Sequence, residues 1–238
     1  MNDELKMRIA GLDWAGIRDS LHWDGFVIVP GVLSREDCEG MIGLYGDAAL
    51  YRKTVDMQRY RFGMGEYKYF RYPLPGVVGS LRAAIYPEIV PVANRWMEEL
   101  GLGVRFPLTH EALCARCAAA GQAFPTALIL RYGPGGFNTL HQDLYGEVFF
   151  PMQALFVLNE EGRDFTGGEF VVTEQVPRAQ SKANVLRPGL GDMVIFTTNF
   201  RPVKGTKGFY RVGMRHGVSP LHSGVRHAMG IIFHDALQ

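Results

Sequence analysis

The pattern of apolar and polar residues divides the chain near residue 125. Before this point, apolar residues recur at helical spacing over several stretches. Ser34 is expected to cap one helix, because its hydroxyl can accept a backbone N–H and Glu36 and Asp37 lie in the first turn. Another helix is expected to be entered through Pro87 and Pro91. The expected elements are helices over residues 13–21, 34–50, 81–100 and 110–120 and a strand over 26–29.

From Pro125 onward the pattern is that of a β structure. Short apolar runs alternate with turns that contain Gly and Pro. Many short strands joined by such turns predict a jelly roll. We therefore expect a mainly β fold with α, in which a double-stranded β-helix core carries N-terminal helices packed on one sheet. The expected strands are residues 127–130, 137–140, 149–158, 167–172, 184–186, 193–196, 212–218 and 225–234.

The chain length of 238 residues fits one domain with a substantial core. We expect a single domain over residues 1–238, with 1–124 as helical support and possible lid and 125–238 as the jelly-roll core. No apolar run approaches the roughly 18 residues of a membrane span, and the N-terminus lacks the shape of a secretion signal. Three cysteines fit a reducing compartment, so a cytoplasmic protein without a membrane partner is expected. A formal net charge of +1 favours no particular partner.

His141 and Asp143 form an H-x-D pair that can hold a cation. Residues at i and i+2 of an extended segment point to the same side, so the imidazole and the carboxylate leave the chain together. Two ligands hold a metal poorly, and His216 is the best candidate for a third. Two histidines and one carboxylate form the facial triad of non-haem Fe(II) oxygenases, which leaves coordination positions open for chemistry.

The order and spacing of these residues resemble the 2-oxoglutarate- and Fe(II)-dependent dioxygenase superfamily. Arg226 follows ten residues after His216, and the apolar run 229–233 follows Arg226. In that family an H-x-D pair and a distal histidine bind the iron, and an arginine at this offset binds the far carboxylate of 2-oxoglutarate. The resemblance covers roughly residues 125–236. The helix, strand and capped helix near the start of the chain are similar to the N-terminal entry of many members.

The resemblance implies a reaction and a set of cofactors. Fe(II) would be bound by the two histidines and the aspartate, with 2-oxoglutarate and O2 as cosubstrates and succinate and CO2 as products. Arg226 would bind the distal carboxylate, for which a guanidinium is suited because it can form two parallel hydrogen bonds. Tyr132 stands where several members place a cosubstrate-binding tyrosine. Gln153 is another side chain that could reach into the barrel.

Two of the residues that follow Arg226 in the chain differ from the family pattern. Many members carry Ser or Thr two residues after the arginine, where this chain has Ala228. The DNA and RNA alkylation-repair demethylases of the superfamily typically carry a second arginine where this chain has Ile232. Arg226, Ala228, Gly230 and Ile232 share one face of the expected strand. The small residues leave room for a ligand beside the guanidinium.

Cysteines and the other histidines have ordinary structural interpretations. Cys114 and Cys117 form a C-x-x-C, but no second pair completes a zinc site and no βαβ context suggests redox chemistry, so packing on a helix is expected. Adjacent residues point apart on a strand, so His234 and Asp235 cannot copy the H-x-D arrangement. The histidines that we do not expect to bind metal are His22, His110, His222, His227 and His234.

Two stretches, residues 51–72 and 201–215, combine basic and aromatic side chains. Cations that alternate with aromatic planes suit a ligand with phosphates and flat rings. The first stretch is interpreted as a twisted hairpin with core-packed aromatics and solvated cations, and a mobile lid over the active site is the functional alternative. The second leads into His216 and should lie near the mouth of the active site. The expected basic rim is Arg59, Arg61, Lys68, Arg71, Lys204, Lys207, Arg211 and Arg215.

The identity of the substrate stays open at this point. A basic rim favours an anionic substrate, and alkylated nucleic acid is the sharpest hypothesis, with phosphates on Lys and Arg and a flipped base against aromatic rings. The reaction would be a hydroxylation or an oxidative demethylation. A protein side chain, an amino acid or a small metabolite are alternative substrates. An inactive jelly-roll binding module is the alternative outside catalysis, and the intact ligand and arginine positions speak against it.

Overall fold

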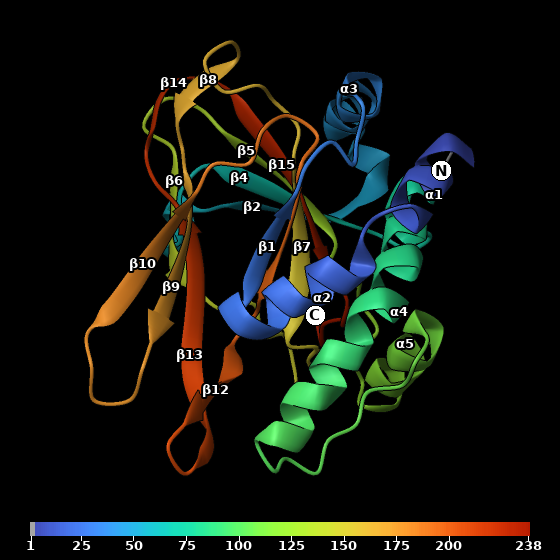
Figure 1. Ribbon diagram of the computed structural model, residues 1–238. Helices are drawn as coiled ribbons and strands as arrows, with labels where there is room; N and C mark the ends of the chain where they lie inside the picture. The colour runs from blue at the N-terminus through green and yellow to red at the C-terminus, as the bar shows by residue number, and fades with distance from the viewer. Residues whose placement is uncertain (1–2) are drawn as a thin grey trace.

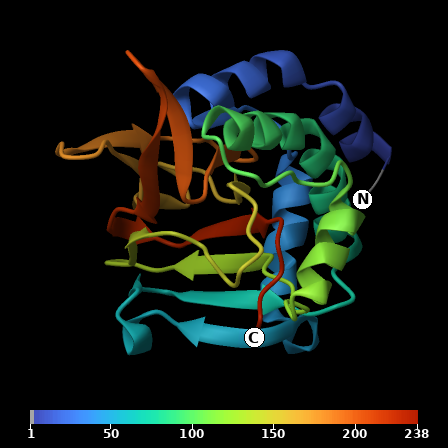
Figure 2. The same ribbon diagram turned by 90° about the horizontal axis from the view of Figure 1, so that it is seen from below.

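Two antiparallel β-sheets packed face to face form the centre of the protein, and helices cover the outer face of the larger sheet (Figure 1). The computed structural model describes residues 3–238, and Met1 and Asn2, which begin the expected domain, lie outside the described residues. Viewed from below, the helices flank the strands on one side (Figure 2). The expected jelly roll with helices packed on one sheet is confirmed.

The larger sheet has the strand order β1-β11-β7-β15-β5-β4-β2. Every neighbouring pair in it is antiparallel. The strand expected at the end of the chain, β15, lies in its middle, and all seven residues of β15 are buried. Its strands are β1 (Phe26–Val29), β2 (Tyr51–Asp56), β4 (Glu66–Phe70), β5 (Leu128–Tyr132), β7 (Met152–Val157), β11 (Met193–Thr197) and β15 (Arg226–Ile232).

The smaller sheet has the order β10-β9-β13-β6-β3, with β12 paired to β13. Strands from the first 124 residues join both sheets, so this part of the chain is more than a helical support. Short strands that the hydrophobic pattern does not reveal also appear, because their residues are largely polar or glycine. The remaining strands are β3 (Gly63–Met64), β6 (Phe137–His141), β8 (Phe165–Gly167), β9 (Phe170–Gln175), β10 (Ser181–Leu186), β12 (Phe200–Gly205), β13 (Gly208–Val218) and β14 (Leu221–Gly224), with β14 paired to β8.

Helices lie at the four expected positions with different ends, and the structure adds a helix over residues 3–10 that was not expected. The expected cap at Ser34 is present as a reciprocal pair of hydrogen bonds with Asp37. That helix ends at Gly43, and two 3-10 turns replace its expected last part. No helix within residues 3–238 combines the length and apolarity needed to cross a bilayer. The helices are α1 (Asp3–Ala10), α2 (Trp14–Asp24), α3 (Arg35–Gly43), η1 (Leu44–Gly46), η2 (Ala48–Leu50), η3 (Gln58–Tyr60), α4 (Gly76–Glu99) and α5 (His110–Ala119).

The two prolines of α4 lie inside the helix, so the expected entry through them is wrong. Pro87 and Pro91 each remove one backbone hydrogen bond, a change that ordinarily breaks a helix. Here α4 is buried along its whole length, from Val78 to Met97, and it packs against α1, α2 and α5 as well as against β12 and β15. This packing compensates for the lost hydrogen bonds, because tertiary burial rather than local propensity supplies most helix stability.

Apolar residues form two main cores on opposite sides of the larger sheet. The first joins α4 and the other helices to the outward side of β7, β11 and β15. The second lies between the two sheets and includes Tyr132, Phe170, Phe196 and Val218. The alternation of side chains along a strand divides one sheet between two cores, as Leu155 and Phe156 illustrate.

Residues 51–72 form a hairpin built into both sheets. β2 pairs with β4, and β4 continues the larger sheet at β5. β3 pairs with β6 in the smaller sheet. Tyr51 and Phe70 pack in the core, as the hairpin interpretation expects.

A buried ion pair fixes α4 to the chain immediately after β15. Arg82 and Asp235 lie 2.9 Å apart with side chains 1% and 4% exposed. Arg82 also donates to the carbonyl of Phe233, and the Tyr72 hydroxyl donates to the second oxygen of Asp235. Both carboxylate oxygens of Asp235 and both terminal nitrogens of Arg82 therefore have a partner, and within residues 3–238 Nε of Arg82 is the one atom of the pair without one. The contact holds the strand that carries Arg226 in place from behind.

Replacing Asp235 by Ala should strongly destabilise the protein. Removal of one partner leaves the Arg82 guanidinium charged and buried, which costs about 3–5 kcal/mol. The measurement is the free energy of unfolding from urea denaturation followed by circular dichroism. Glu88→Ala on the same helix is the control, because its ion pair with Arg18 is more than one third exposed on both sides and worth at most about 1 kcal/mol. Equal losses for the two variants would contradict the structural role of the buried pair.

Candidate metal centre and active site

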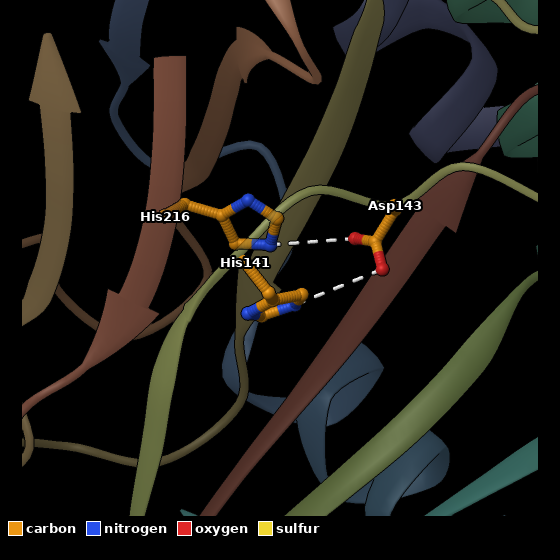
Figure 3. Close-up of side chains that lie close together, drawn as sticks. All are labelled: His141, Asp143 and His216. Carbon is orange, nitrogen blue, oxygen red and sulfur yellow. Dashed lines mark ion pairs between the residues drawn. The ribbon is translucent and has the colours of Figure 1, made fainter. Parts of the chain in front are cut away.

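Three side chains expected to bind metal meet between the two sheets. β13 pairs with β6 so that His216 lies directly opposite His141, and Asp143 follows in the loop after β6. The carboxylate oxygens of Asp143 lie 3.3 Å from Nε2 of His216 and 3.7 Å from Nε2 of His141 (Figure 3). The ligand atoms of all three residues lie within 4.8 Å of one another. Two imidazoles and one carboxylate in this arrangement fit the donor set of a non-haem Fe(II) site.

Close packing of the two strands at this point requires a glycine. A Cβ atom on Gly217, next to His216, would lie 2.6 Å from the carbonyl oxygen of Asn138 in β6. Atoms cannot approach so closely, so glycine at this position lets the strands bring the two histidines together. The register of β13 against β6 also shifts just after His216.

Hydrogen bonds orient His141 for metal binding. Its Nδ1 lies 2.7 Å from the carbonyl oxygen of Thr139. A carbonyl only accepts, so Nδ1 carries the proton and Nε2 is left free to bind a cation. Thr139 is itself held by the carbonyl of Phe62, which accepts from both its N–H and its hydroxyl. The backbone of the 51–72 hairpin thus supports the first ligand.

The surroundings of Asp143 keep its carboxylate charged. The Tyr145 hydroxyl donates to Oδ1 at 2.7 Å, and Tyr69 contacts Tyr145 at 3.0 Å. Burial by itself would raise the pKa of Asp143, but the hydrogen bond with His216 and the nearby imidazoles outweigh burial and lower it. Burial lowers the pKa of His216. A charged carboxylate and a neutral imidazole are the forms in which these residues bind metal.

A cavity of about 220 Å³ extends from the three ligands into the space between the sheets. It reaches from the metal ligands to Arg226. Its walls are largely aromatic and aliphatic. The lining residues used below are Phe62, Tyr67, Tyr69, Tyr132, Gln153, Phe196, Arg226, Ala228, Gly230 and Ile232.

Arg226 is a buried cation in this cavity. Its residue exposure is 2%, and its Nη1 atom has no hydrogen-bond partner. Burial lowers the pKa of its guanidinium, although the group stays charged at neutral pH. No ion pair with an acid involves Arg226 within residues 3–238. The alternate residues of β15 that follow it line the same cavity, in agreement with the expected face of the strand.

Tyr132 and Gln153 also point unpaired polar atoms into the cavity. Tyr132 lies opposite Arg226 on β5, and its ring is 5.9 Å from the Cζ atom of that arginine. Its hydroxyl has no partner, and burial raises its pKa. The Nε2 atom of Gln153 is likewise buried and unpaired. Gln153 pairs with Phe196 across β7 and β11, and the Phe196 ring centre lies 4.8 Å from that of His216. The Gln153 side chain therefore lies at the end of the cavity next to the metal ligands.

The basic residues expected in the first stretch do not line the cavity. The prediction that Lys68 belongs to the basic rim is wrong. Its neighbours Tyr67 and Tyr69 face the cavity, so Lys68 points to the opposite face of β4, where its Nζ lies 4.1 Å from the ring centre of Tyr45. The other three members of this stretch are exposed: Arg59, Arg61 and Arg71.

The basic residues of the second stretch also lie outside the cavity. β12 and β13 form a hairpin that projects from the sandwich, with Lys204 and Lys207 near its tip (Figure 1). Lys207 is nine residues from His216 along an extended strand, a distance of roughly 30 Å. Arg211 stacks on Phe200 at 4.2 Å, and Arg215 is exposed beside the outward side of the ligand strand. The expected basic rim around the mouth is therefore wrong for Lys204 and Lys207.

No other group of metal-binding residues forms within residues 3–238. Cys114 and Cys117 are free thiols on α5, as the packing interpretation expects. His227 bonds Asn159, and His234 accepts from the backbone N–H of Phe150. These hydrogen bonds give the two histidines a structural role.

The chain matches a family of oxygenases. The model of the family Oxygenase-NA, described as "Oxygenase, catalysing oxidative methylation of damaged DNA", matches residues 65–236. The chain belongs to this oxygenase family. It is 42% identical over 194 residues to two proteins of Mycobacterium tuberculosis named only as uncharacterized proteins, MT2286 and Rv2227. These matches cover 82% of the chain and 78% of each relative.

Solved structures share the fold at low sequence identity. A prolyl-4-hydroxylase of Pseudomonas putida has a TM-score of 0.57 at 14% identity and covers 94% of this chain and 100% of its own. An oxidoreductase of the 2OG-Fe(II) oxygenase family from Burkholderia pseudomallei has a TM-score of 0.54 at 17% identity. The match covers 95% of this chain and 94% of the Burkholderia protein. A prolyl hydroxylase of Trichoplax adhaerens, in complex with a hypoxia-inducible-factor peptide, has a TM-score of 0.58 at 14% identity. The match covers 99% of this chain and 94% of the Trichoplax protein.

Family and fold together confirm the resemblance stated from the sequence. The protein is an oxygenase, so the interpretation as an inactive binding module is not supported. The fold of the 2-oxoglutarate- and Fe(II)-dependent oxygenases and the grouped ligands support Fe(II) and 2-oxoglutarate as its cofactors. The structure adds Tyr145 to the site, which the sequence analysis did not single out, and it places Phe62 and Tyr69 of the aromatic stretch 51–72 beside it. Tyr145 lies two residues after Asp143, and this short spacing was the one available signal.

Replacing Tyr145 by Phe should weaken metal binding about 10- to 100-fold, the usual cost of losing a group that orients a metal ligand. The Asp143 carboxylate would lose the hydroxyl that holds it at 2.7 Å. Calorimetric titration with Mn(II) under anaerobic conditions measures the change, and His216→Ala should show no binding. Tyr86→Phe is the matched control, because it removes a buried hydroxyl that donates to Pro107 away from the site. Wild-type affinity in Tyr145→Phe would rule out the orienting role.

Proposed function

We propose that this oxygenase uses Fe(II) bound by His141, Asp143 and His216 and 2-oxoglutarate anchored by Arg226 to oxidise an alkylated base of nucleic acid. The observation that carries the cofactor part is the unpaired guanidinium of Arg226 in the same cavity as the three ligands. The family match carries the substrate part.

An unpaired buried cation requires a ligand of opposite charge. A charge taken out of water without a partner is strongly unfavourable, so proteins seldom keep one without a use for it. A carboxylate of 2-oxoglutarate would restore the pairing, and a guanidinium can bind it through two parallel hydrogen bonds. Ala228 and Gly230 leave the space beside Arg226 that such a ligand needs.

Tyr132 is proposed as the second donor to the same carboxylate. Many superfamily members use a Ser or Thr two residues after the arginine, and Ala228 cannot donate. The Tyr132 hydroxyl is buried and unpaired beside Arg226, so it offers the missing hydrogen bond. A carboxylate with a guanidinium and a hydroxyl around one end would have a defined orientation toward the metal.

Fe(II) and 2-oxoglutarate, when bound, supply the oxidation: 2-oxoglutarate and O2 become succinate and CO2, and one oxygen atom enters the substrate. A hydroxylated N-methyl group then leaves as formaldehyde, and its hydroxyl proton passes to the base nitrogen. The protein orients the reactants. Thr139 and Tyr145 hold two metal ligands in place, and Arg226 anchors the cosubstrate at the far end of the cavity.

The walls of the cavity suit a flat aromatic substrate. Phe62, Tyr67 and Tyr69 line its side next to Asp143 and Tyr145. A base removed from its stack can be held between aromatic rings, and enzymes that act on bases use this arrangement. The family description names damaged DNA, which fits such a pocket.

Hydroxylation of a protein side chain is the second candidate. The structures from Pseudomonas putida and Trichoplax adhaerens are prolyl hydroxylases, but at 14% identity they share only the fold. An amino acid or another small metabolite also stays a candidate. Cytoplasmic location stays a prediction, to which three free cysteines are suited.

Replacing Arg226 by Met should abolish 2-oxoglutarate binding without destabilising the protein. Each hydrogen bond to a charged group is worth about 1.5–3 kcal/mol, so the dissociation constant should rise by at least about 100-fold. Without ligand, the variant should be as stable as the wild type or more stable, because a buried unpaired charge has been removed. Thermal unfolding with Mn(II), with and without 2-oxoglutarate, measures both effects.

Arg131→Met on the neighbouring strand β5 is the control, since Arg131 is exposed. Its stabilisation by 2-oxoglutarate should equal that of the wild type, about 2.7 kcal/mol at 100 times the dissociation constant. A lower stability of Arg226→Met with unchanged ligand binding would mean that Arg226 serves the fold only.

The substrate assignment is tested by product formation with Fe(II), 2-oxoglutarate and O2. A single-stranded DNA oligonucleotide with one N1-methyladenine should yield formaldehyde, succinate and the unmodified base. His141→Ala should yield none. A proline-containing peptide and free proline are offered in parallel. Oxidation of the peptide or of proline, with the methylated oligonucleotide unchanged, would replace the nucleic-acid proposal.

A further inference from the structure

A second hollow adjoins the cavity that contains the metal ligands. It has a volume of about 210 Å³ and is lined by Arg52, Lys53 and Tyr60, among others. Four of its lining residues also line the first cavity: Phe62, Tyr67, Tyr69 and Tyr145. We call this hollow the vestibule. The first cavity has to hold the cosubstrate and the group to be oxidised, so a longer substrate would extend into the vestibule.

Two aromatic rings at the vestibule are largely exposed to solvent. Tyr60 and Phe62 stack with ring centres 5.6 Å apart at an angle of 19°, and they are 48% and 45% exposed. Their segment is held to β6, because the carbonyl of Phe62 accepts two hydrogen bonds from Thr139. The fold therefore presents a flat aromatic surface at a fixed position beside the active site.

Two cations face the same hollow although they are neighbours in the chain. Adjacent residues of a regular strand point to opposite faces. The register of β2 against β4 shifts between Tyr51 and Lys53, so Arg52 sits in a bulge and shares the vestibule with Lys53. Bulges of this kind redirect a side chain next to functional sites.

No Asp or Glu side chain within residues 3–238 lines the vestibule beside these two cations. Neither Arg52 nor Lys53 forms an ion pair with an acid in this part of the chain. The guanidinium of Arg52 lies over the ring of Tyr69 at 4.6 Å and donates through Nε to the carbonyl of Pro125. Its two terminal nitrogens are thereby held at a defined place while their hydrogen bonds remain to be used.

We propose that the vestibule binds the nucleotide next to the target base of a single-stranded nucleic acid. The neighbouring base stacks on the surface formed by Tyr60 and Phe62, and its phosphate pairs with Arg52 and Lys53. Aromatic surfaces with adjacent cations are the usual means of binding single strands without reading their sequence. The inference rests on the proposed function, and it replaces the expected rim by cations that adjoin the cavity.

The test compares a substrate that fills the vestibule with one that does not. The protein is loaded with Mn(II) and 2-oxoglutarate, so that binding is measured without turnover. The probes are a single-stranded pentanucleotide with a central N1-methyladenine and the mononucleotide N1-methyl-dAMP. Tyr60→Ala should weaken pentanucleotide binding about 5- to 100-fold, as expected for the loss of one stacked base. Binding of the mononucleotide should change less than about twofold, since it places no base on Tyr60.

Lys53→Ala tests the phosphate contact through salt. Loss of one phosphate contact should reduce the slope of log affinity against log salt by about 0.7 for a single strand. Tyr210→Ala and Lys204→Ala are the matched controls, because they remove an exposed ring and an exposed cation on the distant β12–β13 hairpin. Neither control should change affinity or slope.

A spectroscopic measurement reports stacking directly. A 2-aminopurine next to the methylated base should lose fluorescence on binding to the wild type and retain it in Tyr60→Ala. If Tyr60→Ala weakened the binding of both nucleotides equally, or of neither, the vestibule inference would be overturned while the proposed function stands. Wild-type protein that binds neither probe, but binds an acidic or proline-containing peptide, would overturn the proposed function and the inference with it.

Discussion

The pairing of β6 with β13 is the constraint on which the active site depends. It sets His216 opposite His141, although 75 residues separate them in the chain. Gly217 allows the two backbones to approach closely enough, because a side chain there would collide with the carbonyl of Asn138. Asp143 is then brought in by the loop that follows β6. A shift of one residue in this register would turn one imidazole to the other face of the sheet.

Donors without acceptors are the chemical signature of the cavity. Arg226, Tyr132 and Gln153 each bury an atom that could donate a hydrogen bond and has no partner. Folded proteins satisfy nearly all buried polar groups, so three such atoms in one cavity mark a place kept for a ligand rich in acceptors. The ion pair of Arg82 and Asp235 shows the contrast, since both carboxylate oxygens and both terminal guanidinium nitrogens there have partners within the protein. One group serves stability, and the other serves binding.

Expectations drawn from the chain succeeded where a local pattern determines the structure. The cap at Ser34, the helix at 110–119 and the strands of the core follow from local hydrogen bonding and from the spacing of apolar residues. The expectations failed where packing overrides local preference. Pro87 and Pro91 lie within α4 because its packing against other helices and the sheet compensates for their lost hydrogen bonds. Lys68 turns away from the cavity because the pairing of β4 with β5 decides which of its faces points inward.

Residue types and their order by themselves determined the chemistry: two histidines and a carboxylate for a metal, and an arginine at a characteristic distance. These features are local or depend only on order along the chain. The tertiary structure alone decided what surrounds them, such as Tyr145 on the carboxylate and the bulge that turns Arg52 toward Lys53. Such contacts join residues far apart in the chain or depend on strand register. Spacing along a sequence does not specify register, since many registers suit the same apolar pattern until the two sheets pack.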